Sequence, residues 1–306
     1  MFPSAYRFVV RIVSLATVSL AVTAFIAPPR AFAGALEVVP TRAAGMGGAL
    51  RGAAVSSAGP ALNPSGMSLS RSYVAEAEYR YLDAENAHIG HVAIADSTSG
   101  SNIGGGVSYT YATSSHDGAG PLGRQEVGLS LSFPLGDRVA IGATGRYLWL
   151  TNQLADGSEA NKSRMTFDAG LTLRPSDKIS IGAVGYGLRD LHDPQSPRAY
   201  AGGIALLPVP EFVLVADVVL DPRTYVYVDD RVKAWTFMGG VEYTFASKFG
   251  FRAGGGHDGL REVGYGTAGL TALGDAGAID LGGRLDFGAS HSFTIGLSLR
   301  LFVPAP

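Results

Sequence analysis

The stretch Glu126-Val127-Gly128-Leu129-Ser130-Leu131-Ser132-Phe133 carries the pattern that decides the fold. From position 127 to position 133, large apolar residues stand at every odd position and small or polar residues at every even one. Because successive side chains of a β-strand point to opposite faces, this pattern predicts a strand with one apolar and one small, polar face. The segments 165–173 and 293–301 repeat it. Strands of about nine to eleven residues can cross a bilayer when tilted.

The same alternation recurs along the chain and predicts about fourteen strands, an even number, as single-chain bacterial barrels have. No apolar run after residue 33 is long enough for a membrane-spanning helix, since the longest, at about 212–220, is interrupted by Asp217. The expected strands are 71–82, 88–96, 102–112, 123–133, 138–150, 163–173, 178–188, 198–207, 211–220, 233–245, 249–256, 263–273, 278–287 and 292–302.

The connections between these strands alternate in length. Short turns are expected at 134–137, 174–177, 207–210, 246–248 and 274–277, and longer polar loops at 151–162, 189–197 and 221–231. Bacterial outer-membrane barrels have short turns on the periplasmic rim and longer loops on the extracellular rim, with aromatic residues near the strand ends. Tyr147 and Trp149 take such places at one end, and Tyr243 and Phe245 at another. The sequence therefore predicts an all-β protein, a transmembrane antiparallel β-barrel in the outer membrane of a Gram-negative bacterium.

Residues 1–33 have the features of a cleaved signal peptide. Arg7 and Arg11 make its start basic, residues 12–26 form an apolar core, and Ala31-Phe32-Ala33 provides the small residues that a signal peptidase reads. The alternative is an N-terminal membrane anchor, for which the apolar run is short. We expect export and cleavage, followed by an N-terminal segment at 34–70, the barrel at 71–302 and a tail at 303–306.

Composition and charge exclude several classes of function. Removal of the signal peptide leaves 21 of the 24 basic residues against 26 acidic ones, a net charge of about −5, which argues against nucleic acid as a partner. The chain has no cysteine, so it has no thiolate metal site and no lipid-modified cysteine. Its six histidines are scattered and form no recognisable catalytic triad. We expect no enzyme, metal or cofactor.

The small, polar face of the predicted strands would line the barrel interior, and it carries charges of both signs. If the chain turns about Ser247, Glu242 lies opposite Arg252, and if it turns about Ser290, Asp280 lies opposite Arg300. Arg146 and Asp168 are further candidates for pairing. Balanced interior charge favours paired groups that fill a narrow or plugged barrel over an ion-selective pore. Such pairs can be purely structural.

The segment 34–70 does not have the pattern of a strand. It is rich in small residues and glycine, with turn-forming pairs at Gly59-Pro60 and Asn63-Pro64. About thirty-five residues with so little apolar surface cannot fold alone, so we expect the segment to fold inside the barrel as a hatch. Pro64 and Asn63 would direct the chain into the first strand. We expect this turn to dock near Gly104, Gly105 and Gly106.

This segment resembles the start of the FadL family of long-chain fatty-acid transporters and their PorV-like relatives. The family begins with Arg-small-small-Gly-Met-Gly-Gly-Ala, then Ala-x-x-x-Asn-Pro-Ala-Gly, then a fourteen-stranded barrel. Residues 42–49 match the first element closely, and Ser65 stands in the second where alanine is usual. The motif residues of the hatch are Gly45, Met46, Gly47, Gly48, Asn63, Pro64, Ser65 and Gly66.

The resemblance implies a hatch that plugs the lumen and passive uptake of hydrophobic molecules such as a fatty acid. It also implies lateral exit through a kinked third strand, where Gly104, Gly105 and Gly106 would permit a kink. The partners would then be outer-membrane lipid and a hydrophobic small molecule. A PorV-like relative would instead anchor or shuttle secreted proteins at the outer membrane. The chain is shorter than typical transporters of the family, and the sequence names neither the substrate nor a protein partner.

Overall fold

The computed structural model describes residues 38–98, 103–116, 119–153, 159–193, 195–222, 234–288 and 291–303. The predicted signal peptide, 1–33, lies outside these residues, and of the predicted tail only Val303 is described. Within the described part of the chain, no helix has both the length and the apolar character that crossing a membrane requires.

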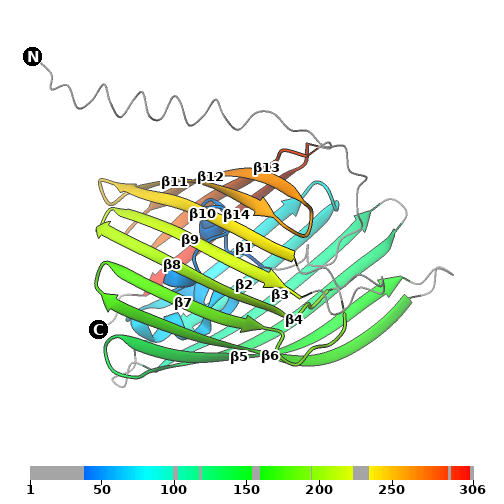
Figure 1. The fold of residues 1–306 in the computed structure, drawn as a ribbon, viewed down its shortest axis with the longest axis horizontal. Helices are drawn as coiled ribbons and strands as arrows, with labels where there is room; N and C mark the ends of the chain where they lie inside the picture. The colour runs from blue at the N-terminus through cyan, green and yellow to red at the C-terminus, as the bar shows by residue number, and fades with distance from the viewer. Residues whose placement is uncertain are drawn as a thin grey trace, which may run out of the picture.

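Fourteen antiparallel strands form one closed barrel, which confirms the predicted fold class (Figure 1). Each strand pairs with its sequence neighbours, and β1 pairs with β14 to close the ring. The strands are β1 (Tyr73–Leu82), β2 (Ala87–Asp96), β3 (Gly104–His116), β4 (Ala119–Pro134), β5 (Val139–Gln153), β6 (Glu159–Ser176), β7 (Ile179–Tyr186), β8 (Ala199–Val209), β9 (Phe212–Asp221), β10 (Ala234–Phe245), β11 (Phe249–Asp258), β12 (Val263–Leu273), β13 (Gly277–Asp286) and β14 (Phe293–Val303).

The alternating residues face the sides that the sequence predicts. Leu129 is 60% exposed on the outside of β4, whereas the neighbouring Ser130 is fully buried on the inside. Large apolar side chains are exposed in the same way on the outer faces of the other strands, including Phe167, Phe251 and Leu297. Such an apolar outer surface around a polar interior is the arrangement of a transmembrane barrel.

Strands β3 to β6 extend further than the predicted segments. In β6 the predicted strand is 163–173, but pairing with β5 continues back to Glu159. The side chains of residues 161–165 are all exposed, so both faces of this part of the strand meet solvent or lipid. Without one buried face, the sequence has no reason to alternate there, and the pattern ends before the strand does.

The two rims of the barrel differ in their connections. The rim that holds the start of β1 and the end of β14 has turns of two to four residues at most positions, such as 177–178 and 210–211. We call it the periplasmic rim and the opposite one the extracellular rim, following the usual orientation of bacterial barrels. The predicted alternation of loop lengths is not strict. The connection 97–103 on the periplasmic rim is long, and 83–86 on the extracellular rim is short.

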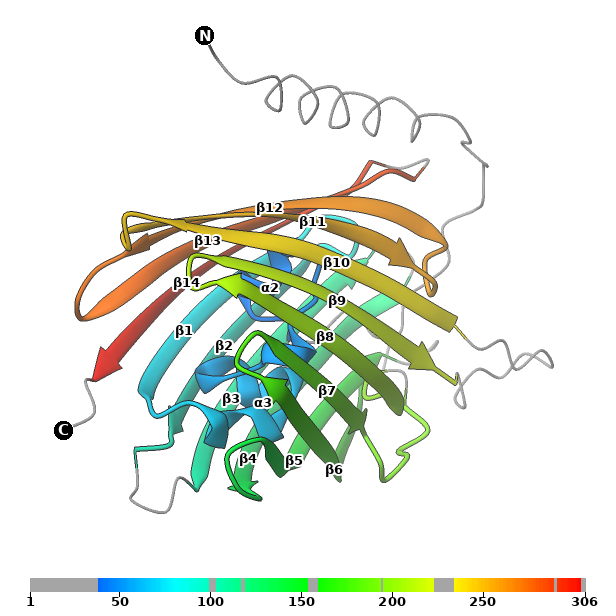
Figure 2. The ribbon, with the colours of Figure 1, turned by 60° about the vertical axis from the view of Figure 1, so that its left-hand side comes forward.

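Residues 38–69 form short helical turns that lie inside the ring of strands (Figure 2). These turns are α2 (Thr41–Ala44), η1 (Arg51–Ala53), η2 (Ser56–Ala58), α3 (Gly59–Leu62) and η3 (Pro64–Leu69). Met46, Leu50 and Leu62 are buried against inward side chains of the wall, Val213 and Val215 among them. We call residues 38–69 the hatch.

The contact between the hatch and the wall explains the high glycine content. A Cβ on Gly240 would stand 2.6 Å from Met46 Cα, and one on Gly142 would stand 2.5 Å from Ser65 N. Gly170, Gly182 and Gly254 have equally close contacts to the hatch. Inward positions of the wall are therefore glycine where the hatch backbone lies directly against the strands.

Candidate functional site

The Asn63-Pro64 turn of the hatch is fixed by hydrogen bonds to β4 and β6. Asn63 Nδ2 donates to Thr172 Oγ1 at 3.2 Å and to Leu171 O at 3.3 Å, while Asn63 Oδ1 accepts from Ser65 Oγ at 2.7 Å. Ser132 Oγ donates to Ser65 O at 2.7 Å. The Ser65 hydroxyl also lies 2.7 Å from Thr172 Oγ1. The hydroxyl of Ser65, at the position where the similar FadL motif has alanine, thus adds one contact between hatch and wall.

The glycines of the first hatch motif have a conformational role. Gly47 and Gly48 have φ angles of +75° and +86°, which residues with a side chain rarely adopt. Gly47 N donates to Thr267 Oγ1 at 2.8 Å, and Gly47 O accepts from Tyr265 Oη at 2.8 Å. Met46 is fully buried. This turn therefore holds the hatch against β12.

In the described residues, the strand pairing at Gly104, Gly105 and Gly106 gives no support to the predicted kink. Gly105 and Gly106 pair in regular register with β2 and β4, Gly104 pairs with β4, and the register of β3 shifts only between Ser114 and His116. The glycines provide space instead, because a Cβ on Gly104 would stand 2.9 Å from Met67 Cβ and one on Gly106 3.0 Å from Pro60 Cγ.

The docking position of the turn also differs from the prediction. Pro60 and Met67 lie against Gly104 and Gly106, whereas Asn63 and Ser65 lie against Gly170 and Gly142 on β6 and β5. The physical reason is that the Asn63 amide needs hydrogen-bond partners, which Thr172 and the Leu171 carbonyl provide.

Glu242 and Arg252 lie directly opposite each other on β10 and β11, and Glu242 Oε2 accepts from Arg252 Nε at 2.5 Å. The hatch adds a third member, because Arg42 Nη2 donates to Glu242 Oε1 at 2.6 Å. Glu242 therefore connects the hatch to the barrel wall as well as one strand to the next. The sequence pattern of the strands alone did not indicate Arg42.

Asp280 and Arg300 form an ion pair of 2.7 Å, but not from opposite positions. Asp280 lies opposite Ser298, and Arg300 opposite Ala278, so the predicted register is wrong by two residues. The two side chains share one face and meet diagonally, which long side chains permit. Arg146 and Asp168 also meet diagonally, at 2.5 Å, since Arg146 lies opposite Thr166.

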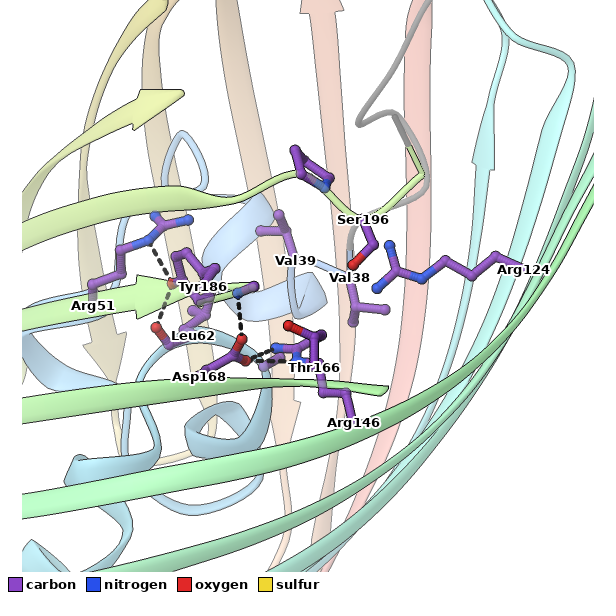
Figure 3. Close-up of a pocket in the computed structure, with 13 residues that line it drawn as sticks. Val38, Val39, Arg51, Leu62, Arg124, Arg146, Thr166, Asp168, Tyr186 and Ser196 are labelled. Carbon is purple, nitrogen blue, oxygen red and sulfur yellow. Dashed lines mark hydrogen bonds and ion pairs between the residues drawn. The ribbon is translucent and has the colours of Figure 1, made fainter. Parts of the chain in front are cut away.

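Between β4 to β7 and the hatch, Arg146 and Asp168 line a cavity of about 30 Å³ together with Arg51 and Arg124 (Figure 3). Asp168 accepts from Arg146 and, at 2.9 Å, from Gly187 N, and Arg51 Nε donates to Tyr186 Oη at 2.9 Å. A space of this size holds a water molecule or two. It is too small for an organic ligand, so we do not regard it as the functional site.

A cavity of about 210 Å³ lies in the extracellular half of the lumen, on top of the hatch. Its position follows from its lining, which comes from the extracellular halves of β1 and β7 to β14 and from the hatch turn around Gly47. Apolar side chains line one part of it, and arginines and hydroxyl groups the rest. The lining includes Val39, Arg51, Arg80, Leu82, Tyr186, Ala199, Val219, Thr236, Met238, Asp258, Leu260, Arg261, Tyr265, Thr267, Arg284 and Thr294.

Ion pairs hold the loop residue Arg261 at the extracellular end of this cavity. Arg261 pairs with Asp286 at 3.0 Å and with Glu85 of the connection between β1 and β2. Burial raises the pKa of the Glu85 carboxyl above its usual value, and the charge of Arg261 opposes that rise. Arg284 pairs with Asp286 at 2.6 Å and lies over the ring of Tyr265, 3.7 Å from its centroid. The cluster joins two connections and two strands at one end of the cavity.

Sequence reasoning missed this cavity. Of its lining residues only Gly47 and Gly48 are among the motif residues of the hatch, and the lining comes from nine strands, a loop and the hatch, spread between residues 39 and 296. The one available signal was the run of charged residues at strand ends, Asp258, Arg261, Arg284 and Asp286. That signal indicates an ion-pair cluster but not a cavity.

The fold is similar to that of known channels. CymD, a monoaromatic hydrocarbon channel, matches with a TM-score of 0.67 and 13% identity over 89% of this chain and 98% of that one. The Ralstonia pickettii toluene transporter TbuX matches at 0.64, with 15% identity over 88% and 98%. A Pseudomonas aeruginosa FadL homologue matches at 0.59, with 12% identity over 92% and 99%. No family model and no curated protein matches the sequence. The chain thus has the fold of these proteins, which are a channel, a transporter and a FadL homologue.

Proposed function

We propose that the chain belongs to the FadL-type outer-membrane channels and allows passive uptake of small hydrophobic molecules. The observation that carries the proposal is the cavity of about 210 Å³ inside the barrel, between the extracellular rim and the hatch. Its place in a transmembrane barrel lets a molecule arrive from outside the cell. A cleaved signal peptide at residues 1–33 would export the chain to the outer membrane, where lipid surrounds its apolar outer face.

The size of the cavity favours a small substrate. An engineered apolar cavity of about 150 Å³ in another protein binds benzene. The cavity in this barrel, at about 210 Å³, therefore holds one aromatic ring with a small substituent. This size agrees better with a monoaromatic compound than with the long-chain fatty acid that the sequence resemblance implies.

The route onward passes the hatch. A second cavity, of about 260 Å³, lies at the periplasmic rim between the hatch and strands β1 and β14, where Ser56, Ser72 and Phe302 line it. The hatch separates the two cavities, and Glu242 and Asp217 hold it by ion pairs to Arg42 and Arg51. Because β3 pairs regularly through Gly104–Gly106 in the described residues, we place the exit through a displaced hatch and not through the wall.

The test is a pair of matched substitutions on β9. Val219 lines the cavity, whereas Val218 lies opposite the exposed Phe237 on the outer face. We expect Val219→Trp to fill the cavity and to lower uptake of labelled toluene by Gram-negative cells that carry the protein. Val218→Trp should leave uptake unchanged at equal amounts of folded barrel. Equal uptake by both variants would contradict the proposed site.

The PorV-like scaffold remains the alternative from the sequence, but the structural neighbours give it no support, since CymD, TbuX and TodX are described as channels or transporters. A scaffold would not need the cavity. If Val219→Trp and the wild type were equally able to take up toluene, the scaffold would become the better hypothesis.

A further inference from the structure

We propose that the cavity of about 210 Å³ takes a small molecule with an anionic oxygen acceptor, a monoaromatic carboxylate, in preference to a plain hydrocarbon. This inference rests on the proposed function, because it takes the same cavity as the substrate site. It concerns the class of substrate and follows from how charges are arranged around the cavity.

The charged groups that line the cavity are mostly arginines. Arg51, Arg80, Arg261 and Arg284 line it, with Asp258 as the one acidic residue among the described lining. The other carboxylates that pair with these arginines lie behind them and do not line the cavity. They are Asp217, Glu78, Glu85 and Asp286. The ion pairs therefore turn guanidinium groups toward the cavity, and Asp258, which pairs with Arg261 and Arg284, is the one carboxylate beside them in the described lining. The charged groups that a ligand meets are thus mostly hydrogen-bond donors.

The arginines also have unused hydrogen-bond donors. Arg51 donates through Nε and Nη1, and Arg284 through Nε and Nη2. Among the described residues, Arg51 Nη2 and Arg284 Nη1 have no acceptor. A hydrocarbon that displaces water from these groups leaves them without a partner, whereas a carboxylate accepts from them.

Two hydroxyl groups of the lining already have acceptors in the hatch. Tyr265 Oη donates to Gly47 O at 2.8 Å, and Thr267 Oγ1 donates to Gly45 O at 3.1 Å. Their hydrogens are thus already used by the hatch. The cavity contributes arginine donors that a ligand can satisfy, and guanidinium groups bind carboxylates strongly, often through two parallel hydrogen bonds.

The remaining lining fits an aromatic ring. Leu82, Val219 and Met238 provide an apolar wall, and Arg284 Cζ lies over the Tyr265 ring, 3.7 Å from its centroid. A cavity of this volume holds a ring with a small substituent. The lining therefore offers apolar contact for a ring and charged donors for a carboxylate in one space.

Three probes with one aromatic ring test the inference on the full-length mature protein in lipid nanodiscs. Equilibrium dialysis measures the binding of labelled benzoate, toluene and benzylammonium, with empty nanodiscs subtracted. We expect benzoate to bind at least about tenfold more tightly than toluene, and benzylammonium not to bind above background. If toluene binds as tightly as benzoate, the inference is wrong and the proposed function stands. If none of the three binds, both fail.

A substitution tests whether Arg284 is responsible for the preference for benzoate over toluene. Arg284→Met should weaken benzoate binding about tenfold and leave toluene binding unchanged, because it removes donors but keeps an apolar side chain. Arg138→Met is the matched control, since Arg138 is exposed in a turn at the periplasmic rim. Equal loss in both variants, or loss of toluene binding together with benzoate in Arg284→Met, would overturn the assignment. If Arg284→Met does not fold, the comparison of the three probes on the wild type decides alone.

Discussion

A methyl group added to the inner wall should displace the hatch. In Gly142→Ala the new Cβ would stand 2.5 Å from Ser65 N and 2.6 Å from Pro64 C, both backbone atoms, whereas ordinary contact begins at 3.4 Å. The turn must then move by about 0.9 Å. The two hydrogen bonds of Ser65 to Thr172 and Ser132, each 2.7 Å, would lengthen to about 3.6 Å and be lost. At about 1 kcal/mol for each bond, we expect a loss of about 2 kcal/mol, within the usual cost of overpacking.

The control for this prediction lies on the same strand. Gly145 points outward, and a Cβ added there meets nothing within 4 Å, so Gly145→Ala should not destabilise the protein. Urea unfolding in lipid vesicles, followed by tryptophan fluorescence, measures the difference between the two variants. Protease cleavage within 58–66 should also increase in Gly142→Ala alone. Identical unfolding midpoints and cleavage rates in the two variants would refute the docking of the hatch against β5.

Two further predictions use matched pairs of substitutions. Leu129→Arg puts a charge on the lipid-facing side of β4 and should cost about 2–4 kcal/mol in folding free energy in vesicles. The control, Leu135→Arg, lies in an exposed turn at the rim and should cost about 0–1 kcal/mol. Similar costs would contradict the assignment of faces. Asp280→Asn leaves the buried Arg252 and the partly buried Arg300 without their shared carboxylate. It should cost about 3–5 kcal/mol, measured by urea unfolding, so a loss below about 1 kcal/mol would mean that these charges are solvated.

The fold could be predicted because alternate residues of a transmembrane strand face two different environments, lipid outside and the barrel interior inside, and their polarity differs accordingly. Register could be predicted only across short connections. The turn 246–248, with positive φ at Ala246 and Ser247, fixes Glu242 opposite Arg252, as the sequence predicts. Between β13 and β14, seven residues separate the last paired residues, Leu285 and Phe293. There the predicted register is wrong by two residues.

The hatch motifs were visible in the sequence, but the places where they dock were not. Gly104-Gly105-Gly106 is equally compatible with a kink and with close packing, and only the position of Met67 and Pro60 decides between them. The cavity was beyond sequence reasoning for a related reason. Its walls come from residues far apart in the chain, such as Val39, Val219 and Arg284, which only the closed barrel brings together.

The central claim is that the hatch seals the lumen below the cavity, and single-channel current in a planar lipid bilayer tests it most directly. Residues 58–66 include the α3 helix and the turn that Asn63 fixes to β6. We expect the wild type to give no steady current. A variant that lacks residues 58–66 should still fold as a barrel, because the strand pairing does not involve them, and should give stable, water-filled channels. A folded deletion variant that stays as tightly sealed as the wild type would contradict the claim.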